Sequence, residues 1–239
     1  MRGKAVLWIL VGMLAAVVAS PVSVFAAACA TNPTDLVTFL GGPGGVPAPC
    51  SFSVGSLTFT GADTLAVSGS GQFTPANAAG ASALSVQGGV FSGLPGLHIT
   101  GPMIVGPAPN SSLDISFAYT VISSGTPIHD VHLFFNGAGG STAVTETVRD
   151  FTGGVVGAVL ANAFVSNPPP NFTSDLVLTH DTFAIIVFKD IVLANGSQGG
   201  LATISIIDQL ITVPEPATLL LLGSGLIGMA LGQRRFRRK

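Results

Sequence analysis

The chain has 239 residues, of which 48% are hydrophobic and only 8% are charged, against about 25% charged in an ordinary soluble domain. Seven of the nine Lys and Arg residues stand at the two ends, at Arg2, Lys4 and within 234–239. Residues 29–213 keep two cations against ten acids, a formal net charge of −8. An anionic body without a basic patch is repelled by phosphate backbones, so we expect no nucleic-acid partner.

The N-terminus has the three parts of a secretory signal over residues 1–28. Arg2 and Lys4 form the positive region, residues 5–19 are apolar, and Ala26-Ala27-Ala28 offers a small-residue cleavage site. An uncleaved membrane helix is the competing interpretation. Lipid attachment to Cys29 is another, although position 26 holds Ala where a lipid-attachment motif usually has Leu.

The C-terminus, residues 214–239, also has three parts in a fixed order. Pro214, Glu215 and Pro216 come first, residues 217–232 form an uncharged apolar run, and five cations close the chain. The run is close to the shortest length that crosses a bilayer as a helix. The positive-inside rule keeps the cations in the cytoplasm and so places the body outside the inner membrane. A plain membrane anchor is the alternative.

This tail resembles the PEP-CTERM sorting domain of Gram-negative bacteria. The resemblance rests on Pro214-Glu215-Pro216-Ala217-Thr218, the Leu219–Leu222 run with Gly223, and Gly225-Leu226, and covers about the last 27 residues. It implies that an exosortase, a cysteine transpeptidase-like membrane enzyme, recognises and removes the tail as the protein travels to the cell surface. It implies nothing about the activity of the body.

The two cysteines of the chain, Cys29 and Cys50, fit an exported protein. An oxidising compartment favours a disulfide between them, which would close the glycine-rich segment 41–45. Two unpaired thiols are the alternative, and a metal site needs more ligands than two cysteines supply.

The body, residues 29–213, consists of short β-favouring runs separated by Gly, Pro, Ser and Asn clusters. Apolar residues alternate with small or polar ones from Leu113 to Val121, and again from Val131 to Phe135, which predicts strands with one buried face. Further strands are predicted at Ser56–Thr60, Thr64–Val67, Ala83–Gln87, Ala143–Arg149, Thr182–Leu193 and Ala202–Val213. The last two are expected to form a hairpin around 195–200.

No stretch of the body has sustained helical periodicity, and Pro168-Pro169-Pro170 is expected to be a loop. The predicted fold class is therefore all-β: an antiparallel β-sandwich or jelly-roll-like body, flanked by an N-terminal signal helix and a C-terminal transmembrane helix.

The body also resembles a recurrent group of PEP-CTERM cargo proteins. The resemblance lies in Val54-Gly55-Ser56-Leu57-Thr58-Phe59 after Cys50, in the strand Ile115–Val121, in Lys189-Asp190-Ile191 and in Ile204-Ser205. It spans most of the chain, and this group carries no activity that could be transferred.

Candidate metal and catalytic residues are few. His129 and His132 have odd spacing in a predicted strand, which places the rings on opposite faces unless a bulge intervenes. We interpret them, and His180-Asp181, as surface residues. Glu146 and Asp150 are the obvious carboxylate pair for glycoside hydrolysis, and we expect both to be solvated. No nucleophile elbow surrounds any serine. We therefore expect no enzymatic activity, no cofactor and no metal.

The favoured hypothesis is a non-catalytic protein of the cell surface or extracellular matrix, which exosortase sorts after transient anchoring in the inner membrane. A carbohydrate-binding module or adhesin is the alternative, with an exopolysaccharide as a further candidate partner. The carbohydrate-binding alternative is weakened by the lack of Trp and Tyr rings, which sugar-binding sites favour. Tyr119 is the only Tyr of the body, and Trp8 lies in the signal segment.

Overall fold

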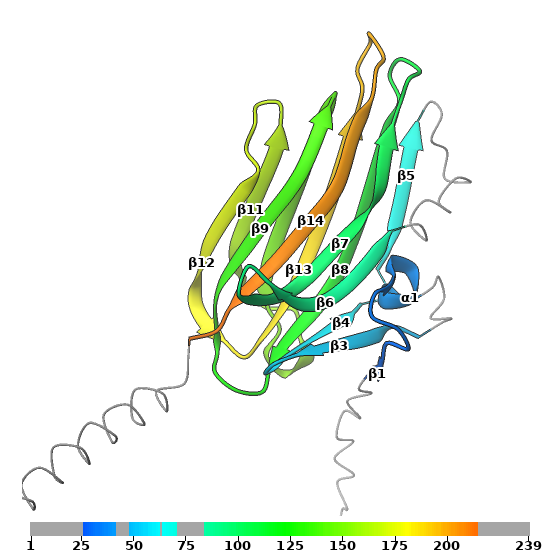
Figure 1. The fold of residues 1–239 in the computed structure, drawn as a ribbon. Coiled ribbons are helices and arrows are strands. Elements are labelled where there is room, and N and C mark those ends of the chain that lie inside the picture. The colour runs from blue at the N-terminus through cyan, green and yellow to red at the C-terminus, as the bar shows by residue number, and fades with distance from the viewer. Residues whose placement is uncertain (1–25, 42–47, 63, 71–83, 215–239) are drawn as a thin grey trace, which may run out of the picture.

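A computed structural model of the chain describes residues 26–41, 48–62, 64–70 and 84–214 (Figure 1). The described residues form two facing β-sheets, a β-sandwich, with one short helix at its side. This confirms the all-β prediction and the sandwich form of it. The signal segment up to residue 25 and the predicted transmembrane helix at 217–232 lie outside the described residues.

One sheet has eight strands and the other has six. The order in the first is β1 (Ala27–Ala28), β3 (Cys50–Val54), β4 (Leu57–Gly61), β8 (Ser112–Ser123), β13 (Ala184–Ala194), β10 (Ser141–Asp150) and β11 (Val159–Asn167), with β5 (Ala66–Ser70) also pairing with β8. The order in the second is β12 (Thr173–Thr182), β9 (Ile128–Gly139), β14 (Ala202–Thr212), β7 (Leu94–Val105), β6 (Ser85–Phe91) and β2 (Thr34–Asp35). All of these pairs are antiparallel except β1 with β3.

The core lies between the sheets and follows the alternation of side chains along each strand. In β8, Ile115, Phe117, Tyr119 and Val121 are buried between the sheets, as the sequence predicts. Ala118, on the opposite face of β8, is buried as well, because the segment after β4 covers it. Its N–H donates to the Thr64 hydroxyl at 2.7 Å.

The predicted hairpin around 195–200 is wrong, because β13 and β14 belong to different sheets. The connection crosses from one layer of the sandwich to the other, and β8 likewise passes to β9 in the facing sheet. Asn195 secures the crossover: its side chain accepts from the Ser111 N–H at 2.9 Å and donates to the Ala108 carbonyl at 2.7 Å. Both strands bury one apolar face, and a crossover lets these faces meet across the core.

Two short helical elements were not predicted. The first, α1 (Leu36–Leu40), begins at Asp35, whose carboxylate accepts from the Thr38 N–H at 2.8 Å and caps the helix. Phe39 of this helix is buried and stacks on Phe52 with ring centroids 5.5 Å apart. The second is the 3₁₀ turn Thr152–Gly154. Elements this short cannot display a helical period in the sequence.

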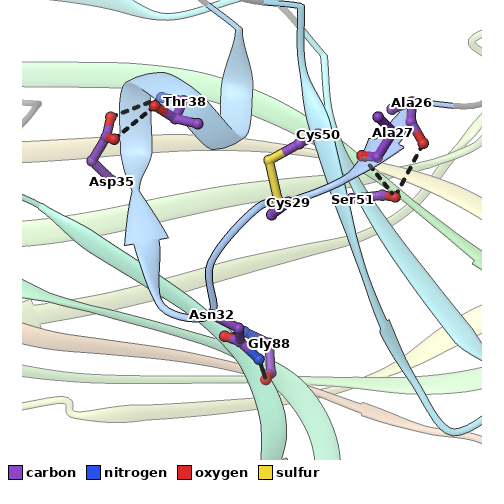
Figure 2. The surroundings of a disulfide bond; sticks show 9 residues. All are labelled: Ala26, Ala27, Cys29, Asn32, Asp35, Thr38, Cys50, Ser51 and Gly88. Atoms are coloured by element: carbon purple, nitrogen blue, oxygen red, sulfur yellow. Dashed lines mark hydrogen bonds between the residues drawn. A yellow bond between two sulfur atoms is a disulfide. The ribbon is translucent and has the colours of Figure 1, made fainter.

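The predicted disulfide between Cys29 and Cys50 is confirmed (Figure 2). It fastens the segment after β1 to the start of β3, beside a hydrogen bond from the Cys29 N–H to the Ser51 carbonyl. Asn32 continues the attachment to the other sheet, because its amide donates to the Gly88 carbonyl at 2.8 Å and its oxygen accepts from the Gly88 N–H. The beginning of the described chain is thus tied to both layers.

Candidate functional site

The outer face of the six-stranded sheet carries a hollow of about 310 Å³. Its lining comes from β12, β9, β14, β7 and the turn before β7. The lining residues are Ser92, Leu94, His132, Leu133, Phe134, Thr173, Asp175, Asp208 and Leu210. We call this the sheet hollow.

The strand register brings these residues together in two rows across the sheet. One row joins Asp175, His132 and Leu210 on β12, β9 and β14. The second joins Thr173, Phe134, Asp208 and then His98 of β7. Residues directly opposite in an antiparallel pair share a face and lie close together, so distant parts of the sequence form one surface.

Hydrogen bonds fix the polar groups of the sheet hollow. His132 Nδ1 lies 2.8 Å from an Asp175 carboxylate oxygen, and Nε2 lies 2.8 Å from the Thr212 hydroxyl. A neutral ring with its proton on Nδ1 satisfies both contacts, with the hydroxyl as donor to Nε2. Asp208 forms a hydrogen bond with His98 Nδ1. Each carboxylate is therefore held by an imidazole and keeps acceptor capacity for a further donor.

Aromatic rings accompany these carboxylates. Phe134 is 38% exposed within the sheet hollow. Phe91 stacks on His98 with ring centroids 5.1 Å apart. Tyr119, the only Tyr of the body, is fully buried between the sheets and is unavailable to a ligand. The arrangement offers apolar ring surface beside oriented acceptors, which suits an uncharged ligand rich in hydroxyl groups.

A second, smaller region of about 250 Å³ lies on the outer face of the eight-stranded sheet and is lined by Ser and Thr residues with Phe188 and Asp190. Burial raises the pKa of Asp190 above its ordinary value of 3.8, and the neighbouring Asp114 carboxylate raises it further. Asp114 and Asp190 are diagonal neighbours on β8 and β13. Among the residues that the structure describes, no group of three or more His, Cys, Asp or Glu side chains is placed to hold a metal ion.

His129 and His132 contact different aspartates and do not form a pair with each other. His129 Nδ1 lies 2.7 Å from Asp181, whereas His132 contacts Asp175. The first contact raises the pKa of His129, with a further contribution from Asp130. Both rings are partly exposed, in line with the prediction of surface residues.

The prediction that Glu146 is solvated is wrong. Glu146 is buried between the sheets, since it occupies the same face of β10 as Val144 and Val148. Asp150, at the end of the strand, is partly exposed and accepts hydrogen bonds from the hydroxyls of Thr152 and Thr182 at 2.8 and 2.9 Å. The two acids thus have different surroundings. The alternation of Val144, Glu146 and Val148 in the sequence indicates that Glu146 lies on the buried face of the strand.

Sequence reasoning also missed Phe134, Asp175 and Asp208. The outward alternation Asp130, His132, Phe134 along β9 was a usable signal for one strand. No local pattern indicated that β12 and β14 would flank β9 and supply the carboxylates.

The described chain ends at Pro214, just after β14. The Pro214 carbonyl accepts from the Thr126 hydroxyl at 2.9 Å, which attaches this end to the connection between β8 and β9. Glu215 and Pro216 lie outside the described residues. Within the part of the chain that the structure describes, none of the helices has the length and apolar character needed to span a membrane.

Comparison with known proteins identifies one sequence family. Residues 212–238 match the family model described as the PEP-CTERM protein-sorting motif, which confirms the resemblance found in the tail. No curated protein matches the chain.

Solved structures with some likeness to the chain include carbohydrate-binding proteins and a phage enzyme. They include TmCBM61 in complex with β-1,4-galactotriose, at 14% identity and a TM-score of 0.30, with 62% of this chain and 88% of that chain covered. The family 11 carbohydrate-binding module of Clostridium thermocellum, bound to a mixed-linked tetrasaccharide, has 8% identity, a TM-score of 0.24 and coverage of 66% and 90%. The enzymatically active domain of tailspike protein 4 of bacteriophage CBA120 has 12% identity, a TM-score of 0.29 and coverage of 62% and 19%. Similarity at this level carries no argument about ligand or activity.

Proposed function

We propose that this chain, whose residues 212–238 carry a PEP-CTERM protein-sorting motif, is an exported protein with a non-catalytic structural role at the cell surface or in the extracellular matrix. An exosortase recognises the motif and removes the tail after the body has crossed the inner membrane. The body then remains outside the cell.

The observation that carries this proposal is the position of the motif. The family match begins at Thr212, the last residue of β14, so the sorting segment starts at the end of the last strand that the structure describes. Removal of the tail at Pro214–Pro216 therefore leaves every strand of the sandwich in place. The Cys29–Cys50 disulfide supports the same destination, because such bonds persist in oxidising compartments outside the cytosol.

The test is to change the sorting motif without touching the body. Glu215→Ala together with Pro216→Ala alters the motif beyond the described sandwich. We expect this variant to stay in the membrane fraction with its tail intact, whereas the unchanged chain reaches the exterior without it. Fractionation measures where the protein is found, and peptide mass mapping of residues 202–239 shows whether the tail is still attached. The control is Val155→Ala with Val156→Ala in an exposed loop, which should be sorted normally. Normal sorting of the motif variant would contradict the proposal.

A second candidate function is carbohydrate binding at the cell surface, and the sheet hollow is the observation that favours it. Phe134 supplies an exposed ring for the C–H face of a sugar. Asp175 and Asp208 supply acceptors for its hydroxyls, each held in place by a histidine. A neutral glycan suits a body of formal charge −8 better than an anionic one.

A glycan array probed with the purified protein tests this candidate. If a glycan binds, Phe134→Ala and Asp208→Asn should each weaken binding about tenfold or more, the loss expected for a stacking or hydrogen-bonding contact. The matched control is Phe164→Ala, which removes a ring that is 52% exposed on β11 of the other sheet. Absence of any bound glycan, or equal losses in the control, would remove carbohydrate binding and leave the structural role.

A further inference from the structure

Three polar side chains meet inside the sandwich, in a core that is mostly apolar. Lys189 and Glu146 lie directly opposite one another on β13 and β10, and Gln209 reaches them from β14 of the facing sheet. The Lys189 Nζ donates to a Glu146 carboxylate oxygen and, at 2.6 Å, to the Gln209 carboxamide oxygen. All three residues are buried, and the side chains of Lys189 and Glu146 have no exposed area.

The surroundings of this cluster exclude water. The residues two positions before and after each polar group on the same strand face are all fully buried. They are Val187, Ile191, Val144, Val148, Ile207 and Ile211. Burial lowers the pKa of Lys189, although the Glu146 charge partly opposes this change. Such an environment favours the neutral amine of Lys189, the form whose nitrogen lone pair can react.

The hydrogen bonds of the cluster are incomplete. The second carboxyl oxygen of Glu146 and the Tyr119 hydroxyl, both fully buried, lack a hydrogen-bond partner among the described residues. A buried ion pair that served stability alone would be expected to have its remaining oxygen satisfied. An oxygen left free to hold or release a proton suits a proton-transfer role instead.

The carboxamide of Gln209 is held in one orientation. Its Nε2 donates to the His132 carbonyl at 3.2 Å, which turns Oε1 toward the amine. The carbonyl carbon Cδ is bonded to that oxygen and is therefore one bond away from the atom that Nζ contacts. A nucleophile, an electrophile and an acid–base group are thus fixed together by the fold before any reaction.

We propose that Lys189 and Gln209 form a spontaneous isopeptide bond, with Glu146 as the proton-transfer group, so that a covalent link joins the two sheets. The Nζ lone pair attacks Cδ of Gln209, and a C–N bond forms. Glu146 accepts a proton from Nζ and delivers one to Nε2. The Cδ–Nε2 bond then breaks, and ammonia leaves.

The reaction balances without a cofactor or an oxidant. A primary amine and a primary amide become one secondary amide and one ammonia, and Glu146 returns to its starting state. Amide exchange of this kind is slow between free molecules. Well-oriented intramolecular reactions reach effective molarities of about 10⁵–10⁸ M, and this is the acceleration that a fixed arrangement of the three side chains would supply. A link between β13 and β14 would resist separation of the layers.

Peptide mapping of the unchanged full-length protein tests the bond directly. After reduction and unfolding, cleavage before Asp190 and Asp208 separates a peptide that ends at Lys189 from one that begins at Asp208. We expect a single branched species containing both peptides, lighter than their sum by one ammonia, about 17 Da. Trypsin should cut after Arg149 and leave Lys189 uncut. Two separate, unmodified peptides would overturn the proposal, as would loss of water with a link from Lys189 to Glu146.

Variants test the role of Glu146. Glu146→Gln keeps the size of the side chain and removes the acid–base group, so the linked fraction should fall at least tenfold. Val177→Ala, at a side chain that is 66% exposed on β12, is the control and should leave the linked fraction unchanged. A folded Glu146→Gln protein that is linked as fully as the unchanged chain would overturn the proton-transfer role. If this variant fails to fold, Gln209→Glu shows whether loss of the carboxamide abolishes the release of ammonia. Whether the Lys189–Gln209 bond exists is tested by the peptide map of the unchanged chain.

Discussion

Gly61 of β4 lies directly against the backbone carbonyl of Phe39 in α1. A Cβ placed on Gly61 would stand 2.0 Å from that oxygen and 2.5 Å from the Leu40 Cα. No rotation of a side chain can relieve these contacts, because both atoms belong to the backbone. The absence of a side chain at Gly61 therefore permits α1 to dock on the sheet, which places Phe39 against Phe52 in the core.

Gly61→Ala should consequently destabilise the protein by about 1–3 kcal/mol, the usual range for overpacking that displaces backbone. Urea denaturation of the purified body measures the change in unfolding free energy. Gly125→Ala is the matched control, since its Cβ would meet only the Ser56 side chain in a connecting segment, at 3.1 Å. An equal loss in both variants would contradict the argument from α1.

The disulfide should contribute about 3 kcal/mol to stability, the entropic effect expected for closing a loop of 21 residues. Reduction should lower the unfolding free energy by this amount, because Cys29 then no longer restricts the segment that joins it to Cys50. Urea denaturation with and without dithiothreitol measures the effect. A double variant, Cys29→Ala with Cys50→Ala, should match the reduced protein and be insensitive to the reductant. Equal stability of the oxidised and reduced forms would refute the contribution.

Local alternation predicted most of the strands but not their assembly. The pattern from Leu113 to Val121 fixes which face of β8 is buried, and the structure has that face inward. The same pattern contains no information on the layer to which a strand belongs. The segment 195–200 has the glycine-rich composition of a hairpin, yet it carries the chain between sheets. That choice depends on which apolar faces meet across the core, a nonlocal property.

For the polar residues too, local alternation predicts burial, whereas the contacts depend on how the strands assemble. Glu146 was predictable as buried from its phase with Val144 and Val148, once the alternation is applied to charged residues as well as apolar ones. Its contact with Lys189 and Gln209 was not predictable, because it requires the register of β10 with β13 and the packing of β14 opposite. The sheet hollow likewise depends on the neighbours of β9.

His129 should titrate above its ordinary pKa of 6.5, because a hydrogen bond to Asp181 and the nearby Asp130 carboxylate favour the protonated ring. Since its pKa is higher in the folded protein, this stabilising contribution is complete below about pH 6.5 and is lost as pH rises through the folded pKa. Asp181→Asn should bring the pKa back toward 6.5, as measured by NMR titration. Asp175→Asn, which affects His132 instead, should leave His129 unchanged. An unchanged pKa in Asp181→Asn would exclude the hydrogen bond as the cause.

The contribution of Asp190 should also be lost as pH rises, here because the charged form is the disfavoured one. Burial and the Asp114 carboxylate raise the pKa of Asp190 above 3.8, so its ionised form is disfavoured in the folded protein. The protonated carboxyl of Asp190 therefore favours folding relative to the charged one. This contribution to the unfolding free energy is fully present below about pH 3.8 and is lost as pH rises through the folded pKa. Asp190→Asn removes the charge and should raise the melting temperature at pH 7, by on the order of 1–3 °C for a partly exposed group.

Because the repulsion requires both carboxylates, Asp114→Asn should also raise the melting temperature at pH 7, and the two substitutions should not add. At pH 3 neither should have much effect, since the raised pKa of Asp190 leaves its carboxyl largely protonated and removes the repulsion. Calorimetry of the single and double variants at both pH values measures the coupling. Additive increases at pH 7, or the same increase at pH 3, would mean that the gain comes from packing of the asparagine and not from relief of the Asp114–Asp190 repulsion.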